Sequence, residues 1–291
     1  MALLVGAWAL GAAGSPPKPG AALSVSEAES VSTSSTSSVP PPGASSPAPR
    51  VQVSHACGFS LSPGTAPAPV GSCTVLEIGD SLGNDLGWGL AGHVGPSSGL
   101  DLVQLDRSAT GLANSSFYNW PAELAVGLSE YHPQLVLVSL GGNDEQGLDV
   151  DGSAVEFLTP AWESAYVDRI QQLVSEAAAS GAYVMCVGLP VMEQHSYSAG
   201  IETLNSLYQQ ALAQTPTASF VSTWSLFANP QGLFQTQAVV DGTATALRQS
   251  DGVHYSEAGE AVIATYVINQ MAQIYHVHLA PIAPAVITSW N

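Results

Sequence analysis

The sequence predicts an α/β fold, a three-layer sandwich with a central, mostly parallel sheet of about five strands. Apolar runs of strand length alternate with longer helical segments, which is typical of parallel sheets covered by helices on both faces. The run at 135–140 is continuously apolar, as expected of a central strand buried on both sides. The segment 160–180 begins with Pro160 and is followed by Gly181, an arrangement favoured at helix boundaries.

Each expected element follows from a local signal along the chain. The strands are short apolar runs at 74–79, 100–105, 135–140, 182–188 and 219–222. The helices are expected at 84–94, where glycines weaken the pattern, and at 160–180, 201–213 and 256–275, the last with Ser256 as its N-cap. We therefore expect one folded domain at 73–280 and a C-terminal tail at 281–291.

The charge balance excludes one class of partner. The chain of 291 residues has five Lys+Arg against 23 Asp+Glu, a formal net charge of -18. Phosphate backbones are repelled by such a surface, so no nucleic acid is expected as a partner. Anionic lipid headgroups are repelled as well. We interpret the acidity as a contribution to solubility rather than to the fold.

The N-terminal part of the chain offers little to bury. Residues 1–14 are apolar and small, and too few to cross a bilayer as a helix, which needs about 20 residues. We interpret them as a signal-peptide core without a basic leader or as the remnant of a membrane helix. Residues 15–72 are a predicted disordered linker, since 15–50 holds 11 Ser and 8 Pro in 36 residues. This predicts a secreted or surface-tethered, extracytoplasmic protein, with an ordinary flexible N-terminus as the alternative.

Three cysteines occur, Cys57, Cys73 and Cys186, and none belongs to a Cys-x-x-Cys pair. A zinc ribbon or a thioredoxin-like site is therefore not supported. Cys57 and Cys73 are close in sequence and could form a disulfide if the protein is exported. Cys186 lies in an apolar run, and we expect it to be a buried core residue rather than a nucleophile.

The first motif whose residues could take part in catalysis is Gly-Asp-Ser-Leu-Gly at 79–83, directly after the first expected strand. Open parallel sheets place their active sites at the carboxyl ends of their strands. A serine such as Ser81, in a tight turn from strand to helix, is exposed, and its N–H can stabilise charge on an attacked carbonyl oxygen. Taken alone, the motif also fits an ordinary turn.

Two further motifs occupy comparable positions. Gly-Gly-Asn-Asp at 141–144 follows the most apolar strand, and the Asn143 amide could act there as an oxyanion donor. Asp-Gly-Val-His at 251–254 precedes the last helix. In it, Asp251 could hold the imidazole tautomer that leaves one nitrogen of His254 free as a base. Each motif alone also fits a turn or a surface loop, but all three lie at strand-to-helix junctions of one domain.

In combination the three motifs resemble the SGNH hydrolase superfamily, which is named for blocks carrying Ser, Gly, Asn and His. Ser81 matches the first block, Asn143 the third, and Asp251 with His254 the last. The Gly block is best matched by Gly111, after the second expected strand. The resemblance covers the expected domain as far as its last helix and implies a flavodoxin-like SGNH fold.

The resemblance implies a serine-dependent carboxylic-ester hydrolase or O-acyl (acetyl) transferase that works through an acyl-enzyme. Ser81 is then the nucleophile, His254 the base, and Asp251 the residue that orients the base. The backbone N–H groups of Ser81 and Gly111 and the amide of Asn143 would form the oxyanion hole. This chemistry requires no cofactor and no metal.

A closer resemblance is to a bacterial SGNH subgroup catalogued as a domain of unknown function. The residues that carry it are Trp162, Tyr166 and Arg169 in a Trp-x-x-x-Tyr-x-x-Arg helix, Gly-Leu-Pro at 188–190, Leu-Asn at 204–205, and the segment 247–254. Related domains occur beside or fused to membrane acyltransferases that decorate cell-envelope polymers. The resemblance implies an extracytoplasmic role on an acyl-ester substrate such as an acylated polysaccharide or peptidoglycan, with a membrane acyltransferase as a partner.

Two alternatives stay open. Ser81 also fits the Gly-x-Ser-x-Gly nucleophile elbow of α/β-hydrolases, but those enzymes place the elbow after several strands and take Asp and His from separate loops. The domain could also be a catalytically silent glycan-binding or assembly module on an SGNH scaffold. The intact set of Ser81, Asn143, Asp251 and His254 favours an enzyme.

Three other residues are candidates for the substrate cleft: Asp80, Asp144 and Arg248. Asp80 and Asp144 are also expected to hydrogen-bond turn backbone. Arg248 could instead support the loop of the base through an ion pair. Glu193 and His195 either line the same cleft or lie in a solvated loop.

Overall fold

The computed structural model describes residues 59–62, 72–94, 98–277, 279, 282–283 and 285–290, and a five-stranded parallel sheet lies at its centre. The strands are β1 (Cys73–Gly79), β2 (Leu100–Asp106), β3 (Leu135–Ser139), β6 (Tyr183–Val187) and β7 (Ala218–Val221). Their order is β2-β1-β3-β6-β7, and every neighbouring pair is parallel. The predicted sheet is confirmed.

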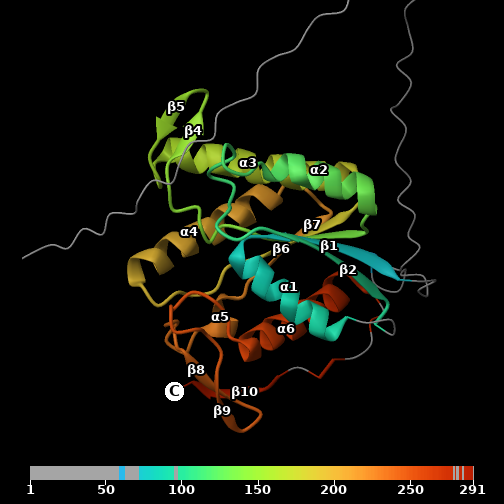
Figure 1. Cartoon of the computed structure of the whole chain (residues 1–291), viewed down its shortest axis with the longest axis vertical. Coiled ribbons are helices and arrows are strands. Elements are labelled where there is room, and N and C mark those ends of the chain that lie inside the picture. Colours follow the sequence, from blue (N-terminus) through green and yellow to red (C-terminus); the bar gives the residue numbers. More distant parts are fainter. Residues whose placement is uncertain are drawn as a thin grey trace, which may run out of the picture. The chain divides into compact units, whose positions relative to one another are not determined.

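Helices cover both faces of this sheet and give the predicted three layers (Figure 1). On one face, α1 (Ser81–His93) and α6 (Glu257–Tyr275) pack against each other. On the other face lie α2 (Trp120–Tyr131), α3 (Pro160–Ala179) and α4 (His195–Leu212), with α3 in contact with both neighbours. A short helix, α5 (Trp224–Phe227), follows β7.

Shorter strands lie outside the main sheet. Between β3 and α3, β4 (Leu148–Val150) and β5 (Ser153–Val155) form a hairpin. A second hairpin consists of β8 (Gln237–Val240) and β9 (Thr243–Ala246), and β10 (Ile287–Trp290) pairs with β8 in antiparallel orientation. The prediction of a plain tail at 281–291 is therefore wrong, because it includes a strand whose partner lies far away in the sequence.

The helices differ from the prediction mainly at their starts. α1 begins at Ser81 rather than at 84, because the Asp80 side chain caps it by accepting a hydrogen bond from the Leu82 N–H at 2.9 Å. α4 begins at His195 rather than at 201. α2 is absent from the prediction, although Pro121 stands in its first turn, where a missing N–H costs nothing.

The glycines of α1 let this helix lie close to its neighbours. A Cβ on Gly83 would stand 2.9 Å from Glu77 Oε1 and 3.0 Å from the Ser139 carbonyl oxygen in the sheet below. A Cβ on Gly89 would stand 2.2 Å from the carbonyl oxygen of Glu260 in α6. The residues that weaken the helical pattern in the sequence are therefore the ones that allow close packing.

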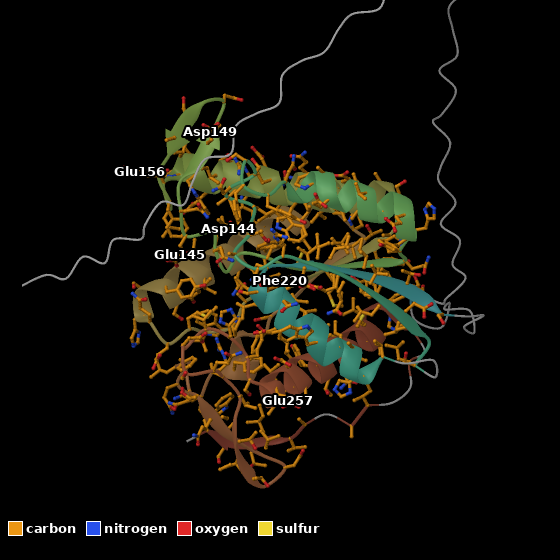
Figure 2. All side chains as sticks on the ribbon, viewed as in Figure 1. Asp144, Glu145, Asp149, Glu156, Phe220 and Glu257 are labelled. Atoms are coloured by element: carbon orange, nitrogen blue, oxygen red, sulfur yellow. The ribbon has the colours of Figure 1, made fainter. Side chains whose placement is uncertain are left out.

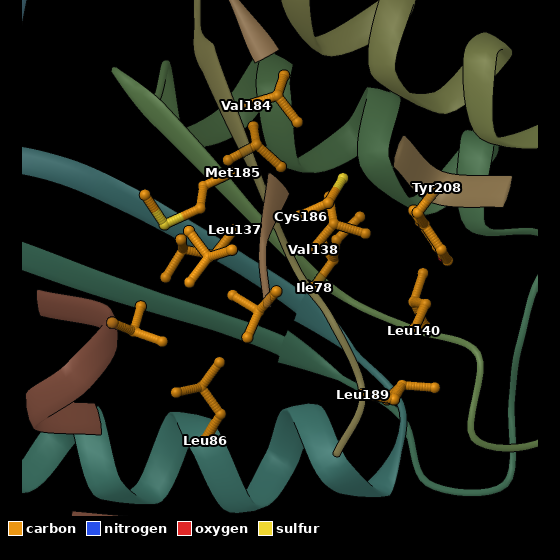
Figure 3. Close-up of a cluster of buried hydrophobic side chains, with 14 of the residues drawn as sticks. Ile78, Leu86, Leu137, Val138, Leu140, Val184, Met185, Cys186, Leu189 and Tyr208 are labelled. Carbon is orange, nitrogen blue, oxygen red and sulfur yellow. The ribbon is translucent and has the colours of Figure 1, made fainter. Parts of the chain in front are cut away.

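Apolar side chains fill the space between the layers. Figure 3 shows part of this core, where Cys186 of β6 lies beside Val138 of β3 and Ile78 of β1, its neighbours across the sheet. Cys186 is only 1% exposed. The expectation that it is a core residue is confirmed.

Part of the predicted linker belongs to the folded domain. Phe59 is 2% exposed, and its ring centroid lies 5.7 Å from that of Tyr275 and 6.1 Å from that of Tyr183. The Ser60 N–H donates to the Tyr275 carbonyl at 2.7 Å. The linker boundary at residue 72 is therefore wrong for 59–62, because one aromatic residue among prolines and glycines gives no periodic signal.

Cys73 is disulfide-bonded. Cys57, the partner expected from the sequence, lies outside the described residues, as does the apolar segment 1–14. None of the helices in the described part of the chain combines the length and hydropathy that a membrane span requires.

Candidate active site

The three sequence motifs meet at the carboxyl edge of the main sheet. Ser81 follows β1, the 141–144 turn follows β3, and these two strands are neighbours. The chain leaves β1 toward α1 on one face and continues from β3 toward α3 on the other (Figure 1). Open α/β sheets bind their ligands where the strand order reverses in this way.

A chain of hydrogen bonds joins Ser81, His254 and Asp251. Ser81 Oγ lies 2.9 Å from His254 Nε2, and His254 Nδ1 lies 2.7 Å from Asp251 Oδ2. Because a carboxylate only accepts, Nδ1 carries the proton, and Nε2 of the neutral ring accepts from the serine hydroxyl. An imidazole oriented in this way can act as the general base for a serine nucleophile.

Asp251 is fixed by its own loop. Its Oδ1 accepts hydrogen bonds from the N–H groups of Val253 at 2.9 Å and His254 at 3.0 Å. Burial acts to raise the pKa of Asp251, but the bonds from the His254 ring and the two N–H groups prevail and lower it to about 2. The carboxylate is therefore ionised at neutral pH, and its side chain is 46% exposed to solvent.

The turn of this loop requires a glycine. Gly252 has a φ of 72°, and a Cβ there would stand 2.4 Å from Glu193 Oε2. The N–H of Glu193 donates to the Gly252 carbonyl at 3.1 Å. The connection between β6 and α4 therefore braces the loop that carries the base.

Arg248 supports the same loop from the interior. It is 2% exposed, and its guanidinium donates to the carbonyls of Val191, at 2.8 Å, and of Val253. It also faces the rings of Phe227, Phe234 and Tyr255. The predictions of a substrate contact or an ion pair for Arg248 are corrected, because the side chain is buried and its hydrogen-bond partners are two backbone carbonyls and the Met192 sulfur, at 3.4 Å.

The segments that carry Gly111 and Asn143 lie against each other. Asn143 Nδ2 donates to the Thr110 carbonyl at 2.9 Å. The Asp144 carboxylate accepts from the N–H groups of residues 112–113, at 3.0 and 2.8 Å. A Cβ on Gly111 would stand 2.1 Å from Asp144 Oδ1, so glycine is required there. The structure thus brings the two expected oxyanion residues onto neighbouring loops.

Asp80 and Asp144 are each 0% exposed, which corrects their prediction as substrate-cleft residues. Asp80 Oδ2 accepts from the N–H groups of Gly141 at 3.1 Å and Gly142 at 2.7 Å. Burial raises the pKa of Asp80 to about 6, against the lowering effect of its backbone donors, and burial also raises the pKa of Asp144. Both residues therefore have the other expected role, the bonding of turn backbone. Figure 2 shows Asp144 beneath α3, while Asp149 lies out at the hairpin.

Tyr197 is a site residue that the sequence analysis missed. Its hydroxyl donates to the Gly142 carbonyl at 2.5 Å, on the turn whose N–H groups Asp80 binds. Tyr197 lies in the first turn of α4, whose start has no side-chain cap at Gln194. Without a capping signal, the sequence pattern did not place this residue on a helix.

A groove of about 520 Å³ lies beside the loop of the base. Its walls come from the β6–α4 connection, the start of α4, α5 and the segment 232–236, and they include Glu193, His195 and Trp224. Glu193 and His195 therefore line a groove, but Ser81 and His254 are not among its lining residues, so the place of Glu193 and His195 in the substrate cleft stays a prediction. Among the residues that the structure describes, no three His, Cys, Asp or Glu side chains form a group that could hold a metal ion.

The family of the chain is shown by its sequence. The model of a family described as protein of unknown function, DUF459, matches residues 74–270. The chain belongs to this family, which is a family of SGNH-like hydrolases. The matched region contains all three motifs. No curated protein matches the chain.

Several solved structures are similar to this chain. TesA is 21% identical over 69% of this chain and 99% of its own, with a TM-score of 0.46. The psychrotrophic esterase EstA from Pseudoalteromonas sp. is 16% identical over 69% of this chain and 98% of its own, with a TM-score of 0.47. LAE5, an alpha/beta hydrolase enzyme from the metagenome of Lake Arreo, Spain, is 16% identical over 70% of this chain and 97% of its own, with a TM-score of 0.50. At these identities the likeness concerns the fold alone.

Proposed function

We propose that the protein is a serine-dependent carboxylic-ester hydrolase in which Ser81 is the nucleophile, His254 the base and Asp251 the orienting acid. The observation that carries the proposal is the continuous hydrogen-bonded chain from Ser81 Oγ through the imidazole to Asp251, with distances of 2.9 and 2.7 Å. Membership in a family of SGNH-like hydrolases supports the same class of reaction.

In the first half-reaction, Ser81 Oγ attacks the ester carbonyl carbon while His254 Nε2 takes the hydroxyl proton. The ionised Asp251 stabilises the imidazolium that forms. Negative charge develops on the carbonyl oxygen, for which the N–H groups of Ser81 and Gly111 and the amide of Asn143 are the proposed donors. His254 then gives its proton to the leaving alcohol, and the acyl group stays on Ser81.

In the second half-reaction, water attacks the acyl carbonyl carbon while His254 Nε2 takes one of its protons. The bond between the acyl carbon and Ser81 Oγ then breaks, His254 returns the proton to Ser81 Oγ, and the free acid leaves. An O-acyltransferase would differ only here, with an alcohol in place of water. The proposed substrates are small esters or acylated cell-envelope glycans, in line with the closer resemblance of the sequence. A disulfide-bonded Cys73 supports an extracytoplasmic location, where a membrane acyltransferase is the proposed partner.

The test is release of p-nitrophenol from p-nitrophenyl acetate by the full chain, by Ser81→Ala and by Ser180→Ala. Ser180 ends α3, where its hydroxyl bonds the Ala177 carbonyl at 2.7 Å, so it serves as the matched control. We expect the wild type and Ser180→Ala to react at similar rates. Loss of the Ser81 hydroxyl should lower kcat at least about 1,000-fold.

Equal rates for the wild type and Ser81→Ala would overturn the proposal. A folded wild type with no activity on any acetyl ester would favour the silent glycan-binding module instead. Adding glycerol to the active enzyme distinguishes the second half-reactions, because an acetylated glycerol product reveals transfer and acetate alone reveals hydrolysis.

A further inference from the structure

One face of α3 reaches both loops that carry the proposed oxyanion donors. Trp162, Tyr166 and Arg169 lie on the same side of this helix, because side chains three or four residues apart point in one direction. Trp162 Nε1 donates to the Gln146 carbonyl at 2.8 Å. The Tyr166 hydroxyl donates to Asp144 Oδ2 at 2.6 Å.

Arg169 binds the other loop. Its Nη1 donates to the carbonyls of Leu112 at 2.6 Å and Ala113 at 2.9 Å, directly after Gly111. Its Nη2 donates to the Asp149 carbonyl at 2.7 Å. No carboxylate lies within salt-bridge distance of this guanidinium in the described part of the chain, so backbone carbonyls are its partners.

Asp144 connects the two loops to the helix. Its carboxylate accepts from the N–H groups of residues 112–113 and from the Tyr166 hydroxyl. Tyr166 is 0% exposed and stacks on Trp162 with ring centroids 4.6 Å apart and planes at 12°, so its hydroxyl is held in one place. Since neither loop has regular secondary structure, side-chain bonds of this kind fix their separation.

We propose that Tyr166 and Arg169 are positioning residues that hold the Gly111 N–H and the Asn143 amide at the separation an oxyanion requires. The inference rests on the proposed function. Neither residue touches the reacting atoms, because Tyr166 acts through Asp144 and Arg169 through the backbone of the 112–113 loop. An oxyanion donor interacts most strongly with charge that develops in the transition state, so its displacement lowers kcat and leaves KM nearly unchanged.

The test compares Tyr166→Phe with Tyr275→Phe. Both variants remove one hydroxyl from a tyrosine that is 0% exposed. The Tyr275 hydroxyl donates to the Val184 carbonyl at 2.7 Å, so its loss also removes a buried hydrogen bond, but one that reaches neither loop. Arg169→Met provides the second positioning variant.

We expect kcat per active site to fall about 10- to 100-fold in Tyr166→Phe and Arg169→Met, with KM changed less than about twofold. Active sites are counted by the stoichiometry of phosphonate labelling at Ser81, so a variant that folds incompletely is not mistaken for a misplaced donor. Tyr275→Phe should keep the kcat of the wild type. Equal kcat values for the two tyrosine variants would overturn the proposal.

Amide hydrogen exchange gives a readout that does not depend on activity. Exchange at Leu112 and Ala113 should be faster in Tyr166→Phe than in Tyr275→Phe, because Asp144 loses the hydrogen bond from the Tyr166 hydroxyl. Unchanged exchange at these two amides would overturn the proposal even if kcat fell. A wild type no faster than Ser81→Ala would reject the proposed function instead, and the exchange comparison would still decide the role of Tyr166.

Discussion

The two sides of the candidate site are held by buried charges of opposite sign. On the oxyanion side, the carboxylates of Asp80 and Asp144 accept hydrogen bonds from the N–H groups of the loops after β2 and β3. On the base side, the guanidinium of Arg248 donates to the carbonyls of Val191 and Val253. The sign of each buried charge is therefore opposite to the partial charge of the backbone groups that it binds.

The comparison shows how loops without regular structure are fixed around a catalytic centre. A buried backbone group that lacks a partner is costly, and one charged side chain can satisfy two or three of them at once. The two sides also differ in solvent access, since Asp80 and Asp144 are fully buried while Asp251 is 46% exposed. The two sides should therefore respond differently to substitution and to pH.

The largest effect is expected from Asp251→Asn on the base side. Asp251 Oδ1 accepts from two backbone N–H groups, so the new amide NH₂ would face His254 Nδ1 and donate to it. The imidazole would then carry its proton on Nε2 and could not take one from Ser81. We expect kcat to fall about 1,000- to 10,000-fold. A fall of less than tenfold in steady-state kinetics would contradict the assigned tautomer.

The next largest effect is expected from Arg248→Met, measured by chemical denaturation. The substitution leaves two buried carbonyls without their charged donor, so the free energy of unfolding should fall by about 2–5 kcal/mol. Arg107→Met, at an exposed position, is the control and should change it by less than about 0.5 kcal/mol. Equal losses in the two variants would show that the guanidinium does not hold the loop of the base.

On the oxyanion side, the buried Asp80 carboxyl should make the free energy of unfolding depend on pH. Because burial raises the pKa of Asp80 from 3.8 to about 6, the native protein binds this proton more tightly than the unfolded chain does. Stability from this group is therefore highest below about pH 4 and declines as the pH rises to about 6. The difference in the free energy of unfolding between the wild type and Asp80→Asn should fall by up to about 3 kcal/mol as the pH is raised from about 4 to about 7.

Asp251 should have the opposite dependence, because its pKa is lowered to about 2. Its contribution is present above about pH 4 and is lost as the pH falls toward 2. Denaturation of the wild type, Asp80→Asn and Asp251→Asn across this range measures both trends. A stability difference between the wild type and Asp80→Asn that is the same at every pH would contradict the raised pKa.

The smallest effect is expected from Cys186→Ala. The side chain is buried in the core and its thiol pKa is raised by burial, so it takes no part in the reaction. Stability should fall by about 1 kcal/mol, and kcat should equal that of the wild type. The native thiol should also resist a thiol reagent that labels it after unfolding. Loss of activity would indicate a cysteine-dependent reaction.

Local signals in the sequence predict the parallel sheet and the three motifs well. Strand ends and helix starts place Ser81, Asn143 and His254 at one edge of the sheet, and this edge is set by topology rather than by side-chain detail. The hydrogen-bonded geometry of Ser81, His254 and Asp251 agrees with that arrangement.

Features that depend on partners far away in the chain could not be predicted from the sequence. β10 pairs with β8, about 50 residues earlier in the chain. From the sequence, Arg248 is expected to contact a substrate or an acidic side chain, and only the folded structure shows that its guanidinium donates to buried backbone carbonyls. Trp162, Tyr166 and Arg169 can be recognised as a helical pattern, but the loops that they bind lie on other parts of the chain. Burial and partner choice at these positions are tertiary effects that periodicity does not report.

The most direct test of the central claim is the reaction of the full chain with diethyl p-nitrophenyl phosphate, followed by peptide mass spectrometry. The account predicts one diethylphosphoryl group per molecule, located on Ser81, with release of one p-nitrophenol and loss of esterase activity in proportion. Asp251→Asn should acquire the group far more slowly. An adduct on another residue, or full esterase activity in a protein already modified on Ser81, would contradict the assignment of the nucleophile.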